Sequence, residues 1–148
     1  MSTRSFTIGA KAVVAAGFAL TLACSGTAPA SAAAPALTAS PSSGLTDGQV
    51  VAVSGTGYAA GSTIVLLECD AAQPAGRACD KADLVGTVAG ADGTLAAKLT
   101  VHRAFQAVDL STGAAGATVD CATAHCVIAS ADTSDTGTAG AGVSITFG

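Results

Sequence analysis

The chain has 148 residues, a length typical of one domain, and a formal net charge of −4. Half of the residues are hydrophobic, yet much of that fraction is alanine and only 3% are aromatic. Valine, leucine and isoleucine recur in short blocks, which favours a folded domain over a disordered polymer. An acidic chain with six lysines and arginines lacks the positive surface of a protein that grips nucleic-acid phosphates by itself.

Residues 1–32 have the pattern of a secretory signal peptide. Arg4 and Lys11 make the start positive, and residues 12–23 are apolar. Residues 30–32 (Ala-Ser-Ala) form a cleavage site of small residues. The apolar run is too short to span a membrane, so we expect secretion and no membrane span.

Cleavage before Ala33 would release a single domain of residues 33–148. That domain contains four lysines and arginines and ten acidic residues, which gives a formal charge of −6. An alternative is a lipid anchor at Cys24 in place of this cleavage. Residues 21–23 (Thr-Leu-Ala) fit a lipoprotein cleavage site poorly, so secretion is the preferred interpretation.

Short apolar or alternating blocks, separated by Gly, Pro, Asp and Ser, follow in chain order and predict β-strands. The strongest strand signal is residues 62–69, a near-continuous apolar run suited to a buried central strand. No segment has a helical period. Strands are expected at residues 36–40, 49–55, 62–69, 84–89, 94–101, around 119, at 127–128 and at 142–148.

Two hairpins are expected among these strands. Residues 84–101 read as strand, turn and return strand, with the turn at residues 90–93 (Gly-Ala-Asp-Gly). Cys121 and Cys126 bracket four small or polar residues between two short apolar runs, which predicts a second hairpin. A disulfide across its mouth would hold the strand register.

The cysteines outside the leader are Cys69, Cys79, Cys121 and Cys126, an even set in an exported chain, so disulfides are expected. Four cysteines allow three pairings. The local one, Cys69 with Cys79 and Cys121 with Cys126, is the simplest. A four-thiolate metal site is disfavoured because no pair has the close C-x2-C spacing.

Seven or eight short strands, with turns about every ten residues, predict an all-β Greek-key sandwich of immunoglobulin size. The chain has no tryptophan, so the Cys…Trp…Cys signature of true immunoglobulin domains is absent.

The sequence offers no set of nucleophile, base and acid, so we expect neither an enzyme nor a metal site. His102 and His125 are isolated and read as surface histidines. Asp80 and Asp83 lie in a polar segment and read as solvated charges.

Several motifs together resemble one known family. They are the run Pro-Ser-Ser-Gly-Leu-Thr-Asp-Gly at residues 41–48, the cysteine spacings, and the segments 99–105, 118–126 and 142–147. On these motifs the chain is identified as a member of the neocarzinostatin family. The resemblance implies a seven-stranded immunoglobulin-like barrel with two side ribbons, each pinned by a disulfide. It also implies a secreted apoprotein that holds an enediyne chromophore non-covalently in a cleft, as carrier and protector.

In that family the released chromophore cuts DNA, so the resemblance implies antibiotic activity and contact with DNA only through the chromophore. It also implies a monomer whose partner is a small apolar metabolite. The family's best-known member has aromatic rings near the positions of Ala71, Leu84, Val108 and Leu110, where this chain has none. An alternative is therefore an extracellular immunoglobulin-like module that binds protein or glycan, with a degenerate pocket and no chromophore. The implied chromophore-binding residues are Ala71, Arg77, Leu84, Val108, Leu110, Val127, Ser130 and Ala131.

Overall fold

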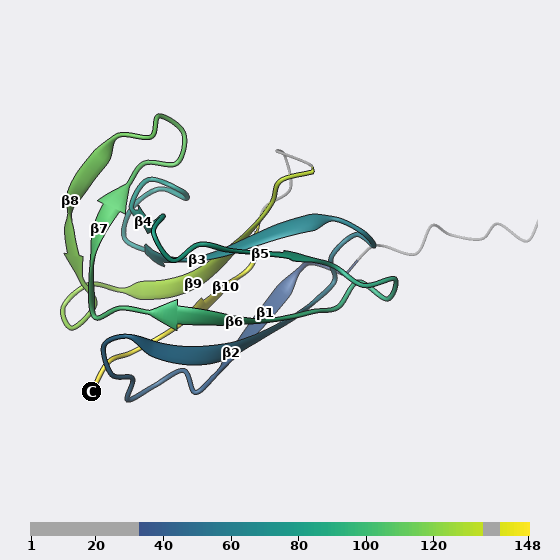
Figure 1. The fold of residues 1–148 in the computed structure, drawn as a ribbon, viewed down its shortest axis with the longest axis horizontal. Helices are drawn as coiled ribbons and strands as arrows, with labels where there is room; N and C mark the ends of the chain where they lie inside the picture. The colour runs from purple at the N-terminus through teal and green to yellow at the C-terminus, as the bar shows by residue number, and fades with distance from the viewer. Residues whose placement is uncertain (1–32, 135–139) are drawn as a thin grey trace, which may run out of the picture. The chain divides into compact units, whose positions relative to one another are not determined.

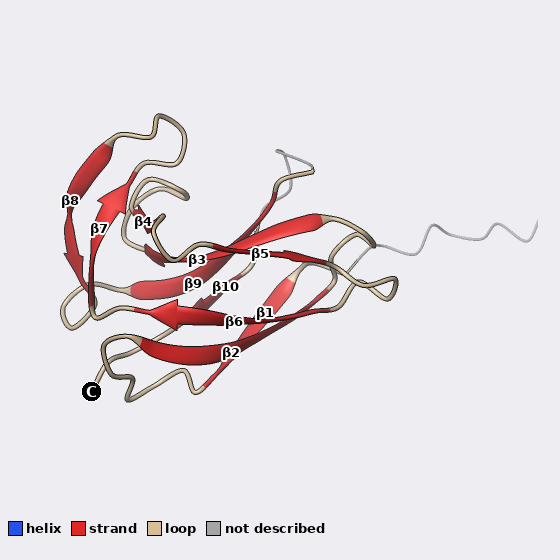
Figure 2. Cartoon of the chain, in the orientation of Figure 1, coloured by secondary structure: helices blue, strands red, loops and turns tan. Residues whose placement is uncertain are grey.

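The computed structural model describes residues 33–134 and 140–148, so the expected signal peptide lies outside the described residues. The described residues form ten β-strands and no helix. Figures 1 and 2 show how these strands are arranged. This part of the chain accordingly contains no helix with the length and apolarity needed to cross a membrane. The strands are β1 (Ala36–Ser40), β2 (Gln49–Thr56), β3 (Thr63–Asp70), β4 (Cys79–Asp80), β5 (Val85–Val88), β6 (Leu95–Val101), β7 (Ala104–Val108), β8 (Ala115–Asp120), β9 (Cys126–Asp132) and β10 (Gly142–Ser144).

The strands form two antiparallel sheets that share one core. The smaller sheet has the order β1-β2-β6, and the larger has the order β10-β9-β3-β4-β7-β8, with β5 also paired to β3. Strand β2 shows how the pattern works: Val51 and Val53 are buried while their neighbours are exposed. Leu66 of β3, Leu99 of β6 and Ile128 of β9 are fully buried in that core. The predicted immunoglobulin-like sandwich is confirmed.

The expected hairpin over residues 84–101 is wrong. Strand β5 pairs with β3, whereas β6 pairs with β2 in the other sheet. The turn at residues 90–93 therefore carries the chain from one sheet to the other. Along β6, Leu95, Leu99 and Val101 are buried in alternation with more exposed residues. A buried face, however, does not specify which strand lies alongside.

The expected hairpin around Cys121 and Cys126 is also wrong, because β8 pairs with β7 while β9 pairs with β3 and β10. The local disulfides themselves are confirmed: Cys69 is bonded to Cys79 and Cys121 to Cys126. The second bridge does not set a hairpin register. It closes the connection between β8 and β9, two strands that are not ladder neighbours in the described sheet.

The two bridges lie in different packing environments. Cys121 and Cys126 belong to the main core. Cys69 and Cys79 form a small separate cluster with Leu67. In Figure 1 the hairpin of β7 and β8 curls over the connection between β3 and β4, and this arrangement frames the candidate site.

Candidate functional site

An open cleft of about 560 Å³ lies between the β3–β4 connection and the face of β9 and β10. Leu67 and Cys69 of β3 line it, together with Val127, Ala129 and Ala131 of β9. Alternate residues of a strand point to the same face, so β3 and β9 form its floor. The described lining contains no aromatic ring, and its many Ala and Gly residues leave the space open.

Strand β3 is buried on both faces, which explains its near-continuous apolar run. Leu66 and Glu68 face the core between the sheets, while Leu67 and Cys69 face the cleft. The Cys69–Cys79 bridge is thus part of the cleft lining.

Five of the eight expected chromophore-binding residues come together here. The structure places Ala71, Leu110, Val127, Ser130 and Ala131 in the lining of this cleft. The other three lie elsewhere.

Arg77 forms an ion pair with Asp109, with 2.6 Å between Nη1 and Oδ2, and its side chain is 55% exposed. The Ser111 hydroxyl and backbone N–H donate to Asp109, and together with Arg77 they lower the pKa of Asp109 to about 2. The backbone N–H of Leu110 also donates to the carbonyl of Gly76, at 2.8 Å. Arg77 therefore fastens the β3–β4 connection to the β7–β8 hairpin, and it lines a separate hollow.

Val108 and Leu84 do not line this cleft. Val108 lines a different hollow that also contains His102 and Phe105. Leu84 precedes β5 and is 38% exposed.

Ser130 lines the cleft, but its hydroxyl already has protein partners. It pairs with the hydroxyl of Tyr58 at 2.8 Å and accepts a hydrogen bond from the N–H of Ala141 at 2.9 Å. Burial raises the pKa of Tyr58, so the phenol stays neutral at physiological pH. This network fixes β10 against β9. Gly140 contributes to the same close approach, since an added Cβ would collide with the carbonyl oxygen of Ser130.

Sequence reasoning did not single out Pro74, Gly76 or Ala141, although all three line the cleft. Pro and Gly are common in turns, so the sequence marks Pro74 and Gly76 of the β3–β4 connection as turn residues and no more. Their position over the cleft depends on the hydrogen bond from Leu110 to Gly76 and on the ion pair between Arg77 and Asp109. No local sequence pattern predicts these contacts.

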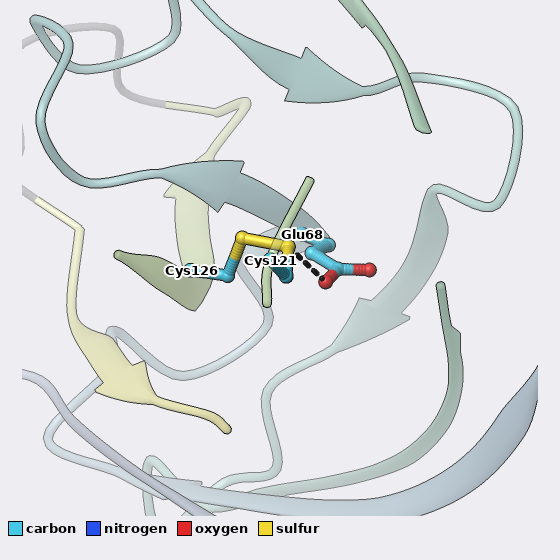
Figure 3. A group of neighbouring side chains, drawn as sticks. All are labelled: Glu68, Cys121 and Cys126. Carbon is cyan, nitrogen blue, oxygen red and sulfur yellow. Dashed lines mark hydrogen bonds between the residues drawn. A yellow bond between two sulfur atoms is a disulfide. The ribbon is translucent and has the colours of Figure 1, made fainter. Parts of the chain in front are cut away.

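Behind the cleft floor, Glu68 is 1% exposed inside the sandwich. Its Oε2 accepts a hydrogen bond from the backbone N–H of His102 at 2.8 Å. Its Oε1 lies 3.2 Å from Sγ of Cys121. Figure 3 marks this contact with a dashed line. A disulfide sulfur has no proton, so a hydrogen bond across this contact requires a protonated Glu68 that donates. Burial raises the pKa of Glu68 to about 7, which keeps that proton available.

The fold and the site define a small disulfide-stabilised β-sandwich with an open apolar cleft of ligand size. The model of the neocarzinostatin family matches residues 37–147, and the chain belongs to that family. The resemblance seen in the motifs is confirmed.

Named relatives agree with this assignment. The chain is 37% identical over 93 residues to macromomycin of Streptomyces macromomyceticus, a match that covers 63% of this chain and 65% of the relative. It is 38% identical over 96 residues to the antitumor antibiotic C-1027 apoprotein of Streptomyces globisporus, covering 64% of each. These matches thus span slightly less than two thirds of each relative's length.

Solved structures extend the agreement to the fold. The structure of macromomycin aligns with a TM-score of 0.70 at 35% identity, covering 78% of this chain and all of the other. The solution conformation of apokedarcidin aligns with a TM-score of 0.58 at 29% identity, with the same coverage.

Proposed function

We propose that residues 33–148 form a secreted carrier that binds one small apolar molecule in the cleft and protects it from solvent. The observation that carries this proposal is an open apolar cleft in a chain of the neocarzinostatin family. Its volume of about 560 Å³ lies within the range of roughly 300–1,000 Å³ typical of small-molecule sites. A relative described as the apoprotein of an antitumor antibiotic supports a role in antibiotic activity.

The cargo is an enediyne-type chromophore held without a covalent bond, in keeping with the family resemblance. With no aromatic ring in the described lining, binding depends on apolar contact with small side chains such as Ala129 and Ala131. This favours a cargo whose buried part is aliphatic or polyunsaturated over one that needs ring stacking. Reactivity resides in the cargo, so the protein itself is not an enzyme.

DNA is reached only by the released cargo. The released domain has a formal charge of −6, which disfavours direct binding to a polyanion. The leader at residues 1–32 directs the chain to export. One copy of the chain contains the whole cleft, so the carrier acts as a monomer.

The alternative, a protein- or glycan-binding module with a degenerate pocket, predicts a cleft closed by its own side chains. The open cleft favours the carrier. The lack of aromatic rings in the described lining is the observation behind the alternative, but an open cleft is not what a degenerate, filled pocket would leave.

The test compares two variants, expressed in the producing organism, in each of which one alanine is replaced by phenylalanine. Ala129→Phe places a ring on the cleft floor, and Ala96→Phe places the same ring on an exposed position of β6 as the matched control. We expect solvent extraction to release a small molecule from the wild type and from Ala96→Phe, but little from Ala129→Phe. Equal recovery from both variants would contradict the assignment of the cleft.

A further inference from the structure

Asp80, Asp83 and His102 converge although they lie in separate segments. Asp80 ends β4, Asp83 follows in the connection to β5, and His102 follows β6. One ligand atom from each lies within 4.8 Å of the other two. Nε2 of His102 is 3.1 Å from Oδ2 of Asp83. Asp80 is buried, so its interpretation as a solvated charge is wrong, and His102 is not isolated. The side chain of Asp83 is 40% exposed, in agreement with its interpretation.

Asp80 is a buried carboxylate, 5% exposed. Its Oδ1 accepts a hydrogen bond from the backbone N–H of Ala82 at 2.9 Å. Among the described residues no lysine, arginine or histidine lies within ion-pairing distance of it. A buried carboxylate without a positive partner is costly, so this position calls for a cation.

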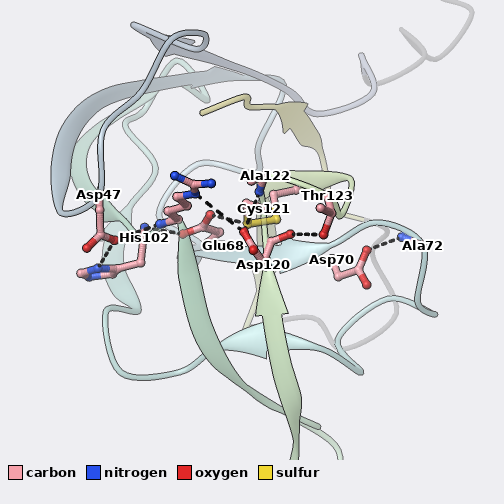
Figure 4. The surroundings of a disulfide bond; sticks show 11 residues. Asp47, Glu68, Asp70, Ala72, His102, Asp120, Cys121, Ala122 and Thr123 are labelled. Atoms are coloured by element: carbon pink, nitrogen blue, oxygen red, sulfur yellow. Dashed lines mark hydrogen bonds and ion pairs between the residues drawn. A yellow bond between two sulfur atoms is a disulfide. The ribbon is translucent and has the colours of Figure 1, made fainter. Parts of the chain in front are cut away.

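His102 is oriented as a metal ligand would be. While Nε2 faces Asp83, Nδ1 lies 3.5 Å from Oδ1 of Asp47. Asp47 is held in turn by the backbone N–H of Arg103, which donates to the same oxygen at 3.0 Å. Figure 4 shows Asp47 next to the His102 ring. A carboxylate that orients the far nitrogen of a metal-binding imidazole is the usual outer-shell arrangement.

The three groups open onto a hollow of about 310 Å³, which all of them line. An ion bound there would be reachable from solvent and would keep room for water beside its protein ligands. Two ligands at about 2.0–2.1 Å from a tetrahedral zinc ion lie roughly 3.4 Å apart. The 3.1 Å separation of His102 Nε2 and Asp83 Oδ2 is close to that value.

We propose that Asp80, Asp83 and His102 bind a divalent transition-metal ion, with Zn²⁺ as the best match. One imidazole and two carboxylates suit Zn²⁺, whereas Mg²⁺ and Ca²⁺ prefer oxygen ligands only. The ion links β4, the β4–β5 connection and the end of β6. Because Cys79 lines the cleft and its neighbour Asp80 holds the ion, the site anchors the strand that carries the cleft disulfide.

The experiment uses the full purified chain, stripped of metal by chelation and titrated with ZnCl₂ in a calorimeter at pH 7.5. We expect saturable binding of one ion per chain. Co²⁺ serves as a spectroscopic probe, and a visible absorption band that Zn²⁺ displaces is expected. Absence of saturable one-to-one binding to the wild type overturns the proposal.

Variants locate the ion. Asp83→Asn and His102→Gln each remove one ligand at a partly exposed position, and we expect at least a tenfold loss of affinity with each. Asp47→Asn, which disturbs only the orienting carboxylate, is expected to weaken binding about 10–100-fold. The matched control is His125→Gln, which alters the exposed histidine between Cys121 and Cys126. Its affinity should equal that of the wild type; a loss there with none in His102→Gln overturns the assignment. At the same zinc concentration, Tm should rise equally in the wild type and in His125→Gln, and by less in His102→Gln.

Discussion

Glu68→Gln should remove a pH-dependent loss of stability, because Glu68 is buried and its pKa is about 7 against an ordinary 4.5. A raised pKa means that the folded chain holds the proton more tightly than the unfolded chain. The resulting stabilisation is complete below pH 4.5 and disappears as the pH rises through about 7.

The rise of the Glu68 pKa from 4.5 to about 7 corresponds to a loss of about 3 kcal/mol of folding free energy by pH 8. Glutamine keeps an oxygen for the His102 N–H, and its amide donates towards the sulfur of Cys121 as the protonated acid does. Unlike glutamate it cannot ionise. The variant should therefore match the wild type to about 1 kcal/mol at pH 4.5 and exceed it by up to about 3 kcal/mol at pH 8.

The assay is urea unfolding at intervals from pH 4.5 to 8, in EDTA so that no bound metal contributes. The matched control is Asp92→Asn, which changes an exposed carboxylate whose pKa is lowered by Thr94. It should leave the slope between pH 5 and 8 unchanged. If the wild type and Glu68→Gln give parallel curves over that range, Glu68 does not hold the proton and the reasoning fails.

The two disulfides should have separable roles. Replacing Cys69 and Cys79 together by alanine removes a bridge from the cleft lining, so the bound molecule should dissociate faster in a release assay, with about 3 kcal/mol lost from stability. Replacing Cys121 and Cys126 should cost about 2 kcal/mol in loop entropy plus lost core packing, seen in urea unfolding, with cargo release following unfolding. Identical release and unfolding profiles for the two double variants would refute this division. Gly140→Ala should lower Tm and weaken cargo retention together, because its Cβ would collide with the carbonyl of the facing β9 residue; an unchanged Tm would contradict that contact.

Much of the fold was predictable because strands with one buried face leave an alternating pattern. Val51 and Val53 on β2 illustrate this, and so does the continuous apolar run of β3, which is buried on both sides. The disulfide pairing followed from proximity in the chain. Strand neighbours did not follow, since a strand's pattern records which face is buried and not which edge it pairs with. For that reason β5 and β6 were wrongly joined as a hairpin.

The candidate sites show the same division. Five of the residues that the family resemblance implied line the cleft, among them Ala71 and Leu110. The resemblance also implied Arg77, which instead forms an ion pair with Asp109. The meeting of Asp80 with His102 depends on where β4 and β6 end in space. Three separate segments contribute, so no local spacing predicted it.

Native mass spectrometry of the protein purified from its producing organism tests whether the chain is a carrier. We expect the mass of residues 33–148 with two disulfides plus one small apolar molecule, which is released intact when the protein is denatured. If the purified protein shows only the mass of the polypeptide under native conditions, it is not a carrier of such a molecule.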